Sequence, residues 1–297
     1  MEIKFRKYKM LSDFERVSAF YFDNYKSLNW STTQPNLAFC HTHGNFNHKR
    51  THRFGIWEEN RQVVATACFE IDLGVYIPLI KEGYEHLRSE MLQYAEQQLC
   101  VCNDGQCSLE VVSTNKENLN EFYLSNGYDL IRTSPILFYQ YEKGFPDCAL
   151  PEGFSIISLE DENDAEKIDR CLWTAFSDAP YIPCDSDERL HKQSSPYFRK
   201  DLTTIVKAPN GDYACYAGMW IDDKNGFAYL EPLGTVPEYR GLGLAKATLM
   251  AAMKKTVSYG AKYCYCGDID FYRSIGCVEV GTLNTWRKEW RHNHASI

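Results

Sequence analysis

The stretch YLEPLGTVPEYRGLGLA, residues 229–245, passes from an extended apolar run through a tight turn into a segment with helical apolar spacing. A helix N-terminus exposes unpaired N–H groups and the positive end of the helix dipole. Gly241 and Gly243 remove the side chains that would keep an anion away from those amides. The stretch therefore predicts a site for a pyrophosphate group at the start of the helix.

The same stretch resembles the cofactor motif of the GNAT N-acetyltransferases, Arg/Gln-x-x-Gly-x-Gly/Ala, which Arg240, Gly243 and Ala245 match. In that family the loop holds the pyrophosphate of coenzyme A and the preceding strand lines the pantetheine arm. The resemblance therefore implies acetyl-CoA as the co-substrate. The residues implied to line pantetheine are Leu233, Gly234, Thr235 and Val236, with Thr235 standing where the family more often has Val. The residues implied to surround the phosphates are Arg240, Gly241, Leu242, Gly243, Leu244 and Ala245.

A second motif, FYRSIG at residues 271–276, resembles the Phe-Tyr-x-x-x-Gly-Phe segment of the same family, with Cys277 in place of the final aromatic. Tyr272 then matches the residue that often protonates the departing thiolate. A phenol with a pKa of about 10 can give a proton to a thiolate leaving group. The alternative interpretation is that Tyr272 only packs beneath the cofactor.

Glu231 is the candidate general base. An amine is protonated at neutral pH, so a group near the cofactor must remove its proton before attack, often through water. Glu231 precedes the cofactor loop by a few residues, where these enzymes frequently place a carboxylate. A structural or substrate-orienting role for Glu231 is the alternative, and Asp268 and Asp270 are weaker candidates for the base.

The two halves of the chain share a pattern. FYLSNGY at 122–128 is followed about 150 residues later by FYRSIGC at 271–277, and each lies between extended runs. A short strand leading into a helical pattern also opens both halves, at 3–25 and at 154–176. We therefore expect an α/β fold of two tandem GNAT-like domains, each with a mostly antiparallel central sheet flanked by helices. Turn formers at 144–153 place the boundary, which gives domains 1–145 and 146–297.

The residue pattern of the C-terminal half predicts an order of helices and strands that ends with a crossover helix and extended runs. The expected elements are strand 154–159, helix 161–177, a helical stretch 186–200, strands 202–207, 213–222 and 227–236, helix 242–259, strand 262–266, short helix 269–275 and strands 277–290.

The N-terminal half departs from the family at the phosphate loop. Residues 74–83, before a helix expected over 80–99, contain no Arg-x-x-Gly-x-Gly/Ala motif, although Tyr123 keeps the position that Tyr272 has in the second half. We therefore expect a degenerate domain that has lost cofactor binding and that shapes the acceptor cleft or a dimer surface.

The composition of the chain disfavours some classes of binding partner. The 297 residues are 44% hydrophobic and carry a net charge of -8, which disfavours binding to nucleic acid or to anionic lipid. There is no apolar run of membrane-spanning length and no secretion signal at the N-terminus, so we expect a cytoplasmic protein without a membrane partner. The twelve cysteines are expected to be reduced. The stretch with Cys40, His41, His43, His48 and His52 is interpreted as a polar loop rather than a zinc site, so no metal is expected.

The resulting functional prediction is an N-acetyltransferase that moves an acetyl group from acetyl-CoA to a primary amine of a small molecule or peptide by direct attack. The alternatives are a different acyl donor, or a non-catalytic acyl-CoA-binding or regulatory protein. A homodimer is the candidate assembly. Acceptor specificity is expected to lie in loops, at 178–199 and 29–53.

Overall fold

The computed structural model describes residues 2–26, 28–183 and 187–291. The chain divides into two compact units. Unit 1 comprises Met1–Ile136 together with Glu279–Ile297, and unit 2 comprises Leu137–Val278. Within the described ranges, no helix combines the length and the apolar character needed to cross a membrane.

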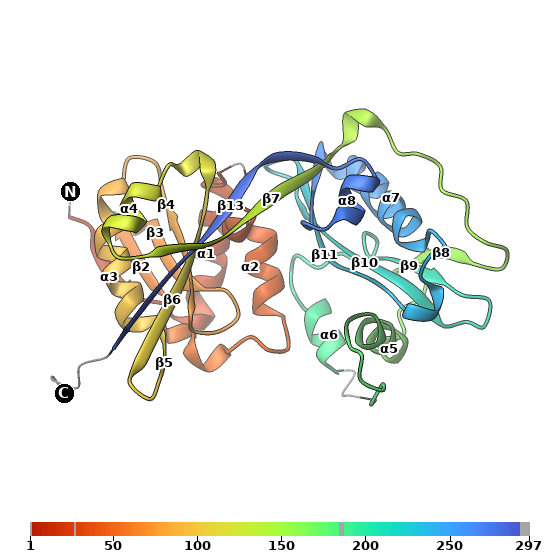
Figure 1. Ribbon diagram of the computed structural model, residues 1–297, viewed down its shortest axis with the longest axis horizontal. Helices are drawn as coiled ribbons and strands as arrows, with labels where there is room; N and C mark the ends of the chain where they lie inside the picture. The colour runs from red at the N-terminus through yellow and green to blue at the C-terminus, as the bar shows by residue number, and fades with distance from the viewer. Residues whose placement is uncertain (1, 27, 184–186, 292–297) are drawn as a thin grey trace. The chain divides into compact units, whose positions relative to one another are not determined.

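The elements of the first half recur in the same order in the second, except that β5 has no counterpart (Figure 1). The first series is β1 (Lys4–Lys7), α1 (Met10–Asp23), α2 (Gln34–His41), β2 (Gly55–Glu59), β3 (Gln62–Phe69), β4 (Val75–Ile80), α3 (Arg88–Gln98), β5 (Val101–Asn103), β6 (Gln106–Thr114), α4 (Asn120–Ser125) and β7 (Asp129–Gln140). The second is β8 (Ser155–Ser158), α5 (Ala165–Phe176), α6 (Asp187–Gln193), β9 (Thr204–Lys207), β10 (Tyr213–Asp222), β11 (Phe227–Thr235), α7 (Leu244–Thr256), β12 (Tyr263–Cys266), α8 (Asp270–Ser274) and β13 (Val278–Arg291). The predicted tandem α/β fold is confirmed.

Each unit contains a mostly antiparallel sheet with one parallel pair. In unit 1 the strand order is β1-β2-β3-β4-β6-β13, with β5 paired to β6, and β4 and β6 run parallel. In unit 2 the order is β7-β12-β11-β10-β9-β8, and β11 and β12 run parallel. Each parallel pair is joined through a helix, α3 or α7, as a parallel connection requires.

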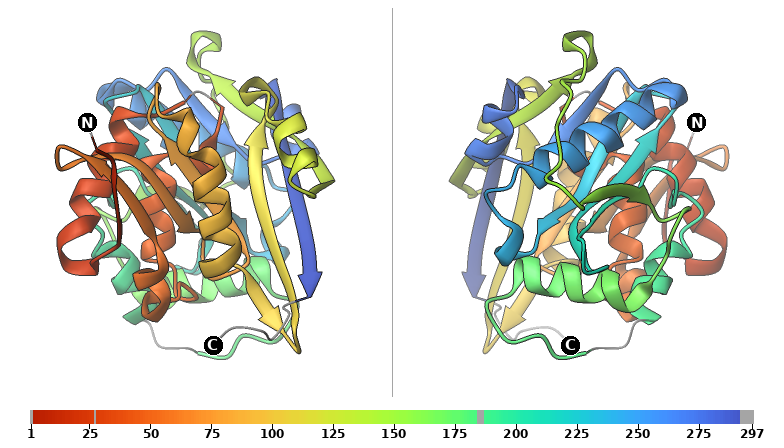
Figure 2. Two further views of the ribbon diagram at one scale, coloured as in Figure 1. Left: turned by 90° about the vertical axis from the view of Figure 1, so that its left-hand side faces the viewer. Right: turned by 90° about the vertical axis from the view of Figure 1, so that its right-hand side faces the viewer.

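The two halves exchange their last strands. In unit 1, β13 pairs with β6 from Leu283 opposite Thr114 to Arg291 opposite Gln106, and the two strands lie side by side in Figure 2. In unit 2, residues 137–140 of β7 pair with β12. The compact units therefore differ from the linear division into 1–145 and 146–297. The turn formers at 144–153 mark where the chain turns, but they carry no information about which sheet a later strand joins.

Helices cover both faces of the sheet in unit 2. Ala217 and Met219 of β10 belong to one apolar cluster with Leu249 of α7. Tyr216, which points to the opposite face of the same strand, belongs to a second cluster with Leu172 of α5. All but one of the residues of β10 are accordingly buried. Figure 1 shows α5 and α6 on one side of this sheet and α7 on the other.

Several helix boundaries differ from those predicted, for local reasons. Helix α5 begins at Ala165 rather than 161 because the Asp164 side chain accepts a hydrogen bond from the Lys167 N–H at 3.0 Å and caps the helix there. Helix α7 begins at Leu244 because Gly243 has a left-handed φ of 76°. The helix expected over 80–99 is shorter, since Ile80 ends β4 and α3 begins at Arg88. The first residue of the helical stretch expected over 186–200 lies outside the described residues, and α6 covers Asp187–Gln193.

One cysteine pair corrects the expectation of reduced thiols. Cys102 and Cys107 face each other across the β5–β6 hairpin and form a disulfide. The Sγ atom of Cys100 lies 3.5 Å from that of Cys102. The spacing of Cys100 and Cys102 predicts only that they share a strand face, whereas the pairing with Cys107 depends on the turn between the two strands.

Alkylation in denaturant without reductant should leave Cys102 and Cys107 unlabelled, and prior reduction should add two labels, as read by peptide mass spectrometry. In the variant Cys107→Ser, the peptide carrying Cys100 and Cys102 should take two labels without reductant, whereas in the wild type only the free Cys100 is labelled. Cys148→Ser serves as the control, because this half-exposed thiol takes no part in the disulfide. Full labelling of the wild-type chain without reductant would contradict the disulfide.

Candidate active site

The parallel strands β11 and β12 separate part of the way along β11. Their pairing runs from Phe227 opposite Tyr263 to Tyr229 opposite Tyr265. Strand β11 continues to Thr235, whereas β12 ends at Cys266. In the described part of the chain, residues 230–235 thus have no strand partner on this side. Unpaired backbone groups there offer hydrogen bonds to an extended ligand that enters between the strands.

A bulge on β11 sets the position of Glu231. Ala217 pairs with Leu233 and Met219 with Leu230, so that Glu231 and Pro232 both lie opposite Gly218. A Cβ atom on Gly218 would come within 2.4 Å of the Glu231 carbonyl oxygen, so this position requires glycine. The Trp220 indole donates a hydrogen bond to the same carbonyl at 3.1 Å. Glu231 is held at the place where the two strands diverge, and its side chain is partly exposed.

Tyr272 lies on α8 next to the separated strands. Its side chain is 8% exposed, and its ring lies against Gly267, where a Cβ atom would come within 2.6 Å of the ring. Burial raises the pKa of Tyr272 most, and the nearby Cys266 and Glu231 raise it further. The phenol is therefore protonated at neutral pH and able to donate a proton. Because Glu231 is among the charged groups that raise the pKa of Tyr272, the two predicted catalytic residues lie within electrostatic range of each other.

The predicted phosphate loop has the backbone that an anion site needs. Gly241 and Gly243 have φ values of 81° and 76°, in the region that favours glycine. A Cβ atom at either position would find no atom within 4 Å, so the surface of the loop is open. Gly243 caps α7, whose first turn contains no acidic residue. The first N–H groups of α7 therefore face an accessible and electropositive space.

Arg240 has a structural role in addition to the one predicted for it. Its guanidinium donates to the carbonyl oxygen of Thr235 at 3.2 Å and to that of Ala175 at 2.9 Å. Ala175 belongs to the last turn of α5, where carbonyl groups lack helical partners. Arg240 thus joins the end of α5 to the end of β11. Its contact with phosphate stays a prediction.

The residues predicted to line pantetheine lie on or just after the unpaired part of β11. Gly234 packs so closely against α5 that a Cβ atom would come within 2.9 Å of Ala175. The Thr235 hydroxyl donates to the Cys215 thiol at 3.2 Å, and the Val236 N–H donates to the Ala214 carbonyl at 3.0 Å. These contacts fix the strand end that leads into the phosphate loop.

Two residues of this site were missed by the sequence reasoning. Gly218 permits the bulge, but its partner on β11 is known only once the register is known. Lys246 lies in the first turn of α7, close in sequence to the phosphate loop. A basic residue just after a glycine loop is a signal that the sequence does contain. Asp268 and Asp270, the weaker candidates for the base, are exposed.

A separate groove of unit 2 runs beside α5 and has a volume of about 690 Å³. Its walls include Arg170 of α5, together with Tyr213, Val236 and Tyr239. Val236 is the only predicted cofactor residue among them, and neither Glu231 nor Tyr272 reaches this groove. The groove is therefore distinct from the neighbourhood of the two catalytic candidates.

The His-rich stretch at 40–52 does not form one ligand set. His41 shares a hydrogen bond with the Leu37 carbonyl at 2.9 Å, and burial lowers the pKa of His41 to about 4. His52 bonds instead to the Lys49 carbonyl. Over the ranges that the structure describes, the only three potential metal ligands that gather closely are Cys100, Cys102 and Cys107, two of which form the disulfide.

Residues 165–277 match the family model described as the acetyltransferase (GNAT) family. The match covers α5 through α8, and so includes the bulge, the phosphate loop and Tyr272. No curated protein sequence matches the chain significantly.

Solved structures share the fold over nearly the whole chain. A GCN5-related N-acetyltransferase from Sphaerobacter thermophilus has a TM-score of 0.61 and 13% identity, covering 98% of this chain and 96% of its own. A tandem GNAT protein from the clavulanic acid biosynthesis pathway has a TM-score of 0.59 and 10% identity, with coverages of 97% and 98%. The N-myristoyltransferase of Saccharomyces cerevisiae has a TM-score of 0.55 and 11% identity, with coverages of 96% and 78%. At such identities the likeness establishes the tandem fold alone.

Proposed function

Because this chain carries a domain of the GNAT acetyltransferase family at residues 165–277, we propose that it transfers an acetyl group from acetyl-CoA to a primary amine. Acyl transfer from a CoA thioester is the chemistry of that family. The observation that supports this function best is the combination of a strand pair that separates after Tyr229 with two left-handed glycines at the start of α7. The separated strands suit the extended pantetheine arm of the cofactor, and the glycines at the helix N-terminus suit its pyrophosphate.

In this proposal the unpaired edge of β11 binds the pantetheine arm by backbone hydrogen bonds. Gly241, Gly243 and the first amides of α7 bind the pyrophosphate, with Lys246 as a further cation near them. The thioester then lies toward the bulge, because the arm runs back along β11 from the loop. That direction brings the reacting carbonyl toward Glu231 and Tyr272.

The reaction needs proton transfer at both catalytic candidates. The amine nitrogen forms a bond to the acetyl carbon as the carbon–sulfur bond breaks, and no covalent enzyme intermediate is required. Glu231 accepts the proton that the amine loses, directly or through water. Tyr272 donates its phenolic proton to the departing sulfur. Its raised pKa keeps that proton on the phenol at neutral pH until the sulfur departs, and the second proton that the nitrogen loses on becoming an amide returns to the phenolate.

Turnover is tested with the full chain, acetyl-CoA and a panel of primary amines, by measuring free CoA and acetylated amine chromatographically. Amine-dependent formation of both products in equal amounts supports the proposal. Binding of acetyl-CoA without turnover on any amine, peptide or small molecule would contradict it. If product formed only with a longer acyl-CoA, the chain would still be an acyltransferase, but acetyl-CoA would not be its donor.

Tyr272→Phe should lower kcat about 100-fold and leave the KM for acetyl-CoA nearly unchanged, because the ring is kept and only the proton donor is lost. Since burial raises the pKa of Tyr272, its acid form persists beyond the pH of about 10 at which an ordinary tyrosine ionises, and the wild-type rate should not fall through its titration below that pH. The matched control is Tyr139→Phe, which removes a hydroxyl from another buried tyrosine of the same apolar cluster. An unchanged kcat in Tyr272→Phe would leave this residue a packing role only.

A further inference from the structure

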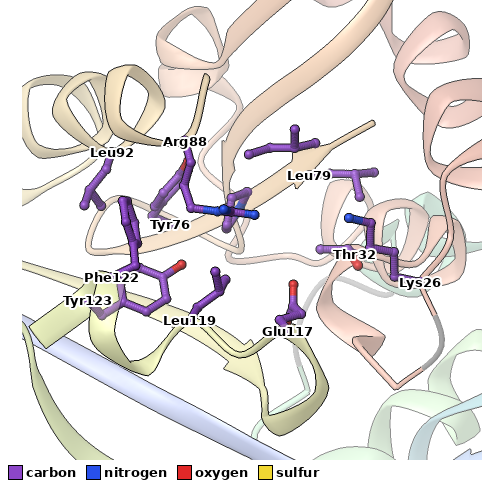
Figure 3. A pocket seen from close by; sticks show the side chains of 12 residues that line it. Lys26, Thr32, Tyr76, Leu79, Arg88, Leu92, Glu117, Leu119, Phe122 and Tyr123 are labelled. Atoms are coloured by element: carbon purple, nitrogen blue, oxygen red, sulfur yellow. The ribbon is translucent and has the colours of Figure 1, made fainter. Parts of the chain in front are cut away.

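A cavity of unit 1 lies where the parallel strands β4 and β6 separate. Their pairing ends at Tyr76 opposite Val111, while β4 continues to Ile80. The cavity lies against β4, the first turns of α3, and the segment from Glu117 to Tyr123 (Figure 3). Its volume is about 30 Å³. Since one water needs about 10–15 Å³ of such space, it has room for only a few heavy atoms.

Two cations reach this cavity without forming an ion pair there. Arg88 is the first residue of α3 and lies 5.8 Å from the centre of the Phe122 ring. Lys26 lines the cavity from the opposite side, and Figure 3 shows both side chains directing their nitrogen atoms into the same space. Among residues 2–26, 28–183 and 187–291, neither side chain has an ion pair within 4.0 Å or a hydrogen bond. The N-terminus of α3, which has no side-chain cap, adds a partial positive charge beside Arg88.

The one carboxylate at the cavity has other partners. Glu117 Oε2 accepts hydrogen bonds from the Thr114 N–H at 2.7 Å, the Thr114 hydroxyl at 3.1 Å and the Asn29 amide at 3.3 Å. This capping box orients Glu117 for the turn that follows β6. Two cations and one carboxylate give the cavity a net charge of about +1. A bound monoanion would neutralise that charge.

The remaining walls supply a proton donor and an apolar lining. Tyr123 is 2% exposed, and its hydroxyl faces the cavity in Figure 3. Burial raises the pKa of Tyr123 most and the nearby Glu117 raises it further, so the phenol remains a hydrogen-bond donor. The side chains of Leu79, Leu92 and Leu119 complete the lining. A ligand that fits must therefore combine an anionic head with a short aliphatic group.

We propose that unit 1 binds a short-chain monocarboxylate, of the size of acetate or propionate, in this cavity. The carboxylate accepts hydrogen bonds from Arg88, Lys26 and Tyr123, and the aliphatic group contacts the leucine side chains. The small volume excludes a pantetheine arm, so this site is not a second cofactor site. It does not depend on the proposed acetyl transfer, which uses residues of unit 2.

The test uses the full chain and sodium acetate at constant ionic strength made up with sodium chloride, with binding followed by ligand-observed NMR of the acetate methyl group. Wild type should broaden this signal in a saturable way. Arg88→Gln should raise the Kd at least about tenfold, because a charged hydrogen bond of the carboxylate is lost. Arg132→Gln is the matched control: this exposed arginine of unit 1 does not line the cavity, and its variant should bind as wild type does.

Further measurements test whether each variant is folded and whether acetate binds in unit 1. Arg88→Lys keeps the charge and should retain most of the affinity, and Tm values show whether each variant is folded. Gly243→Glu, which blocks the phosphate loop of unit 2, should bind acetate normally. Butyrate and larger acids should bind more weakly than propionate. Absence of saturable binding to wild type, equal affinity in a folded Arg88→Gln, or loss of binding in Gly243→Glu would overturn the proposal.

Discussion

Gly243→Glu should abolish the binding of acetyl-CoA to the chain, raising the Kd at least about 100-fold. The substitution places a carboxylate at the cap of α7, where the proposal puts the pyrophosphate. Charges a few ångströms apart near a protein surface repel by about 4 kcal/mol, which is ample for a loss of this size. Isothermal titration should show one equivalent of acetyl-CoA per wild-type chain, because the glycine loop is present only in the second half.

A backbone effect must be separated from this electrostatic one, since Gly243 has a φ of 76° that other residues adopt only with strain. Gly211→Glu is the matched control. Gly211 has a φ of 88°, lies in the turn between β9 and β10 of the same unit, and also has open space where a Cβ atom would be. It should lose similar stability and keep normal binding. Normal acetyl-CoA binding by a folded Gly243→Glu would remove the phosphate loop from the proposed site.

Trp286→Ala should destabilise unit 1 by about 3–5 kcal/mol, the usual cost of truncating a fully buried aromatic residue. Trp286 lies on β13 and is 1% exposed. Its ring stacks on Tyr123 with 5.6 Å between centroids, and its Nε1–H donates to the Ser113 hydroxyl at 3.0 Å. The variant leaves both a cavity and an unsatisfied hydroxyl between β13 and β6.

Hydrogen exchange read peptide by peptide is the appropriate measurement, because a chain with two compact units need not unfold in one step. Protection should fall in β6 and β13 more than in β10 and β11. Trp290→Ala is the control on the same strand, since its side chain is only partly buried and should cost much less. Equal loss of protection in β10 and β6 would contradict the assignment of β13 to unit 1.

The predictability of the site depended on how local each feature is. The phosphate loop was predicted from adjacent residues, because the conformations of Gly241 and Gly243 and the start of α7 are set within one turn of chain. Tyr272 and Glu231 were identified separately through a family resemblance, and their proximity required the fold. Gly218 was missed because its importance arises only from the β10–β11 register, which no local pattern encodes.

The fold, like the site, could be predicted only where the signal lies within a short stretch of sequence. The repeated order of elements followed from the pattern shared by 122–128 and 271–277, and the structure confirms it. The exchange of β7 and β13 could not be predicted from the sequence, because the residue pattern of an extended run does not indicate which sheet the strand joins. The disulfide between Cys102 and Cys107 was likewise hidden, since it depends on a cross-strand pairing and not on the spacing of Cys100 and Cys102.

The position of β13 after all of unit 2 in the sequence has a consequence for synthesis on the ribosome. Unit 2 ends at Val278, whereas unit 1 needs residues from Glu279 onward although it begins at the N-terminus. The nascent chain therefore carries β6 with an open edge throughout translation of the second half, at about 5–20 residues per second. The half made first is therefore the half completed last, because its final strand is synthesised only after the whole of unit 2.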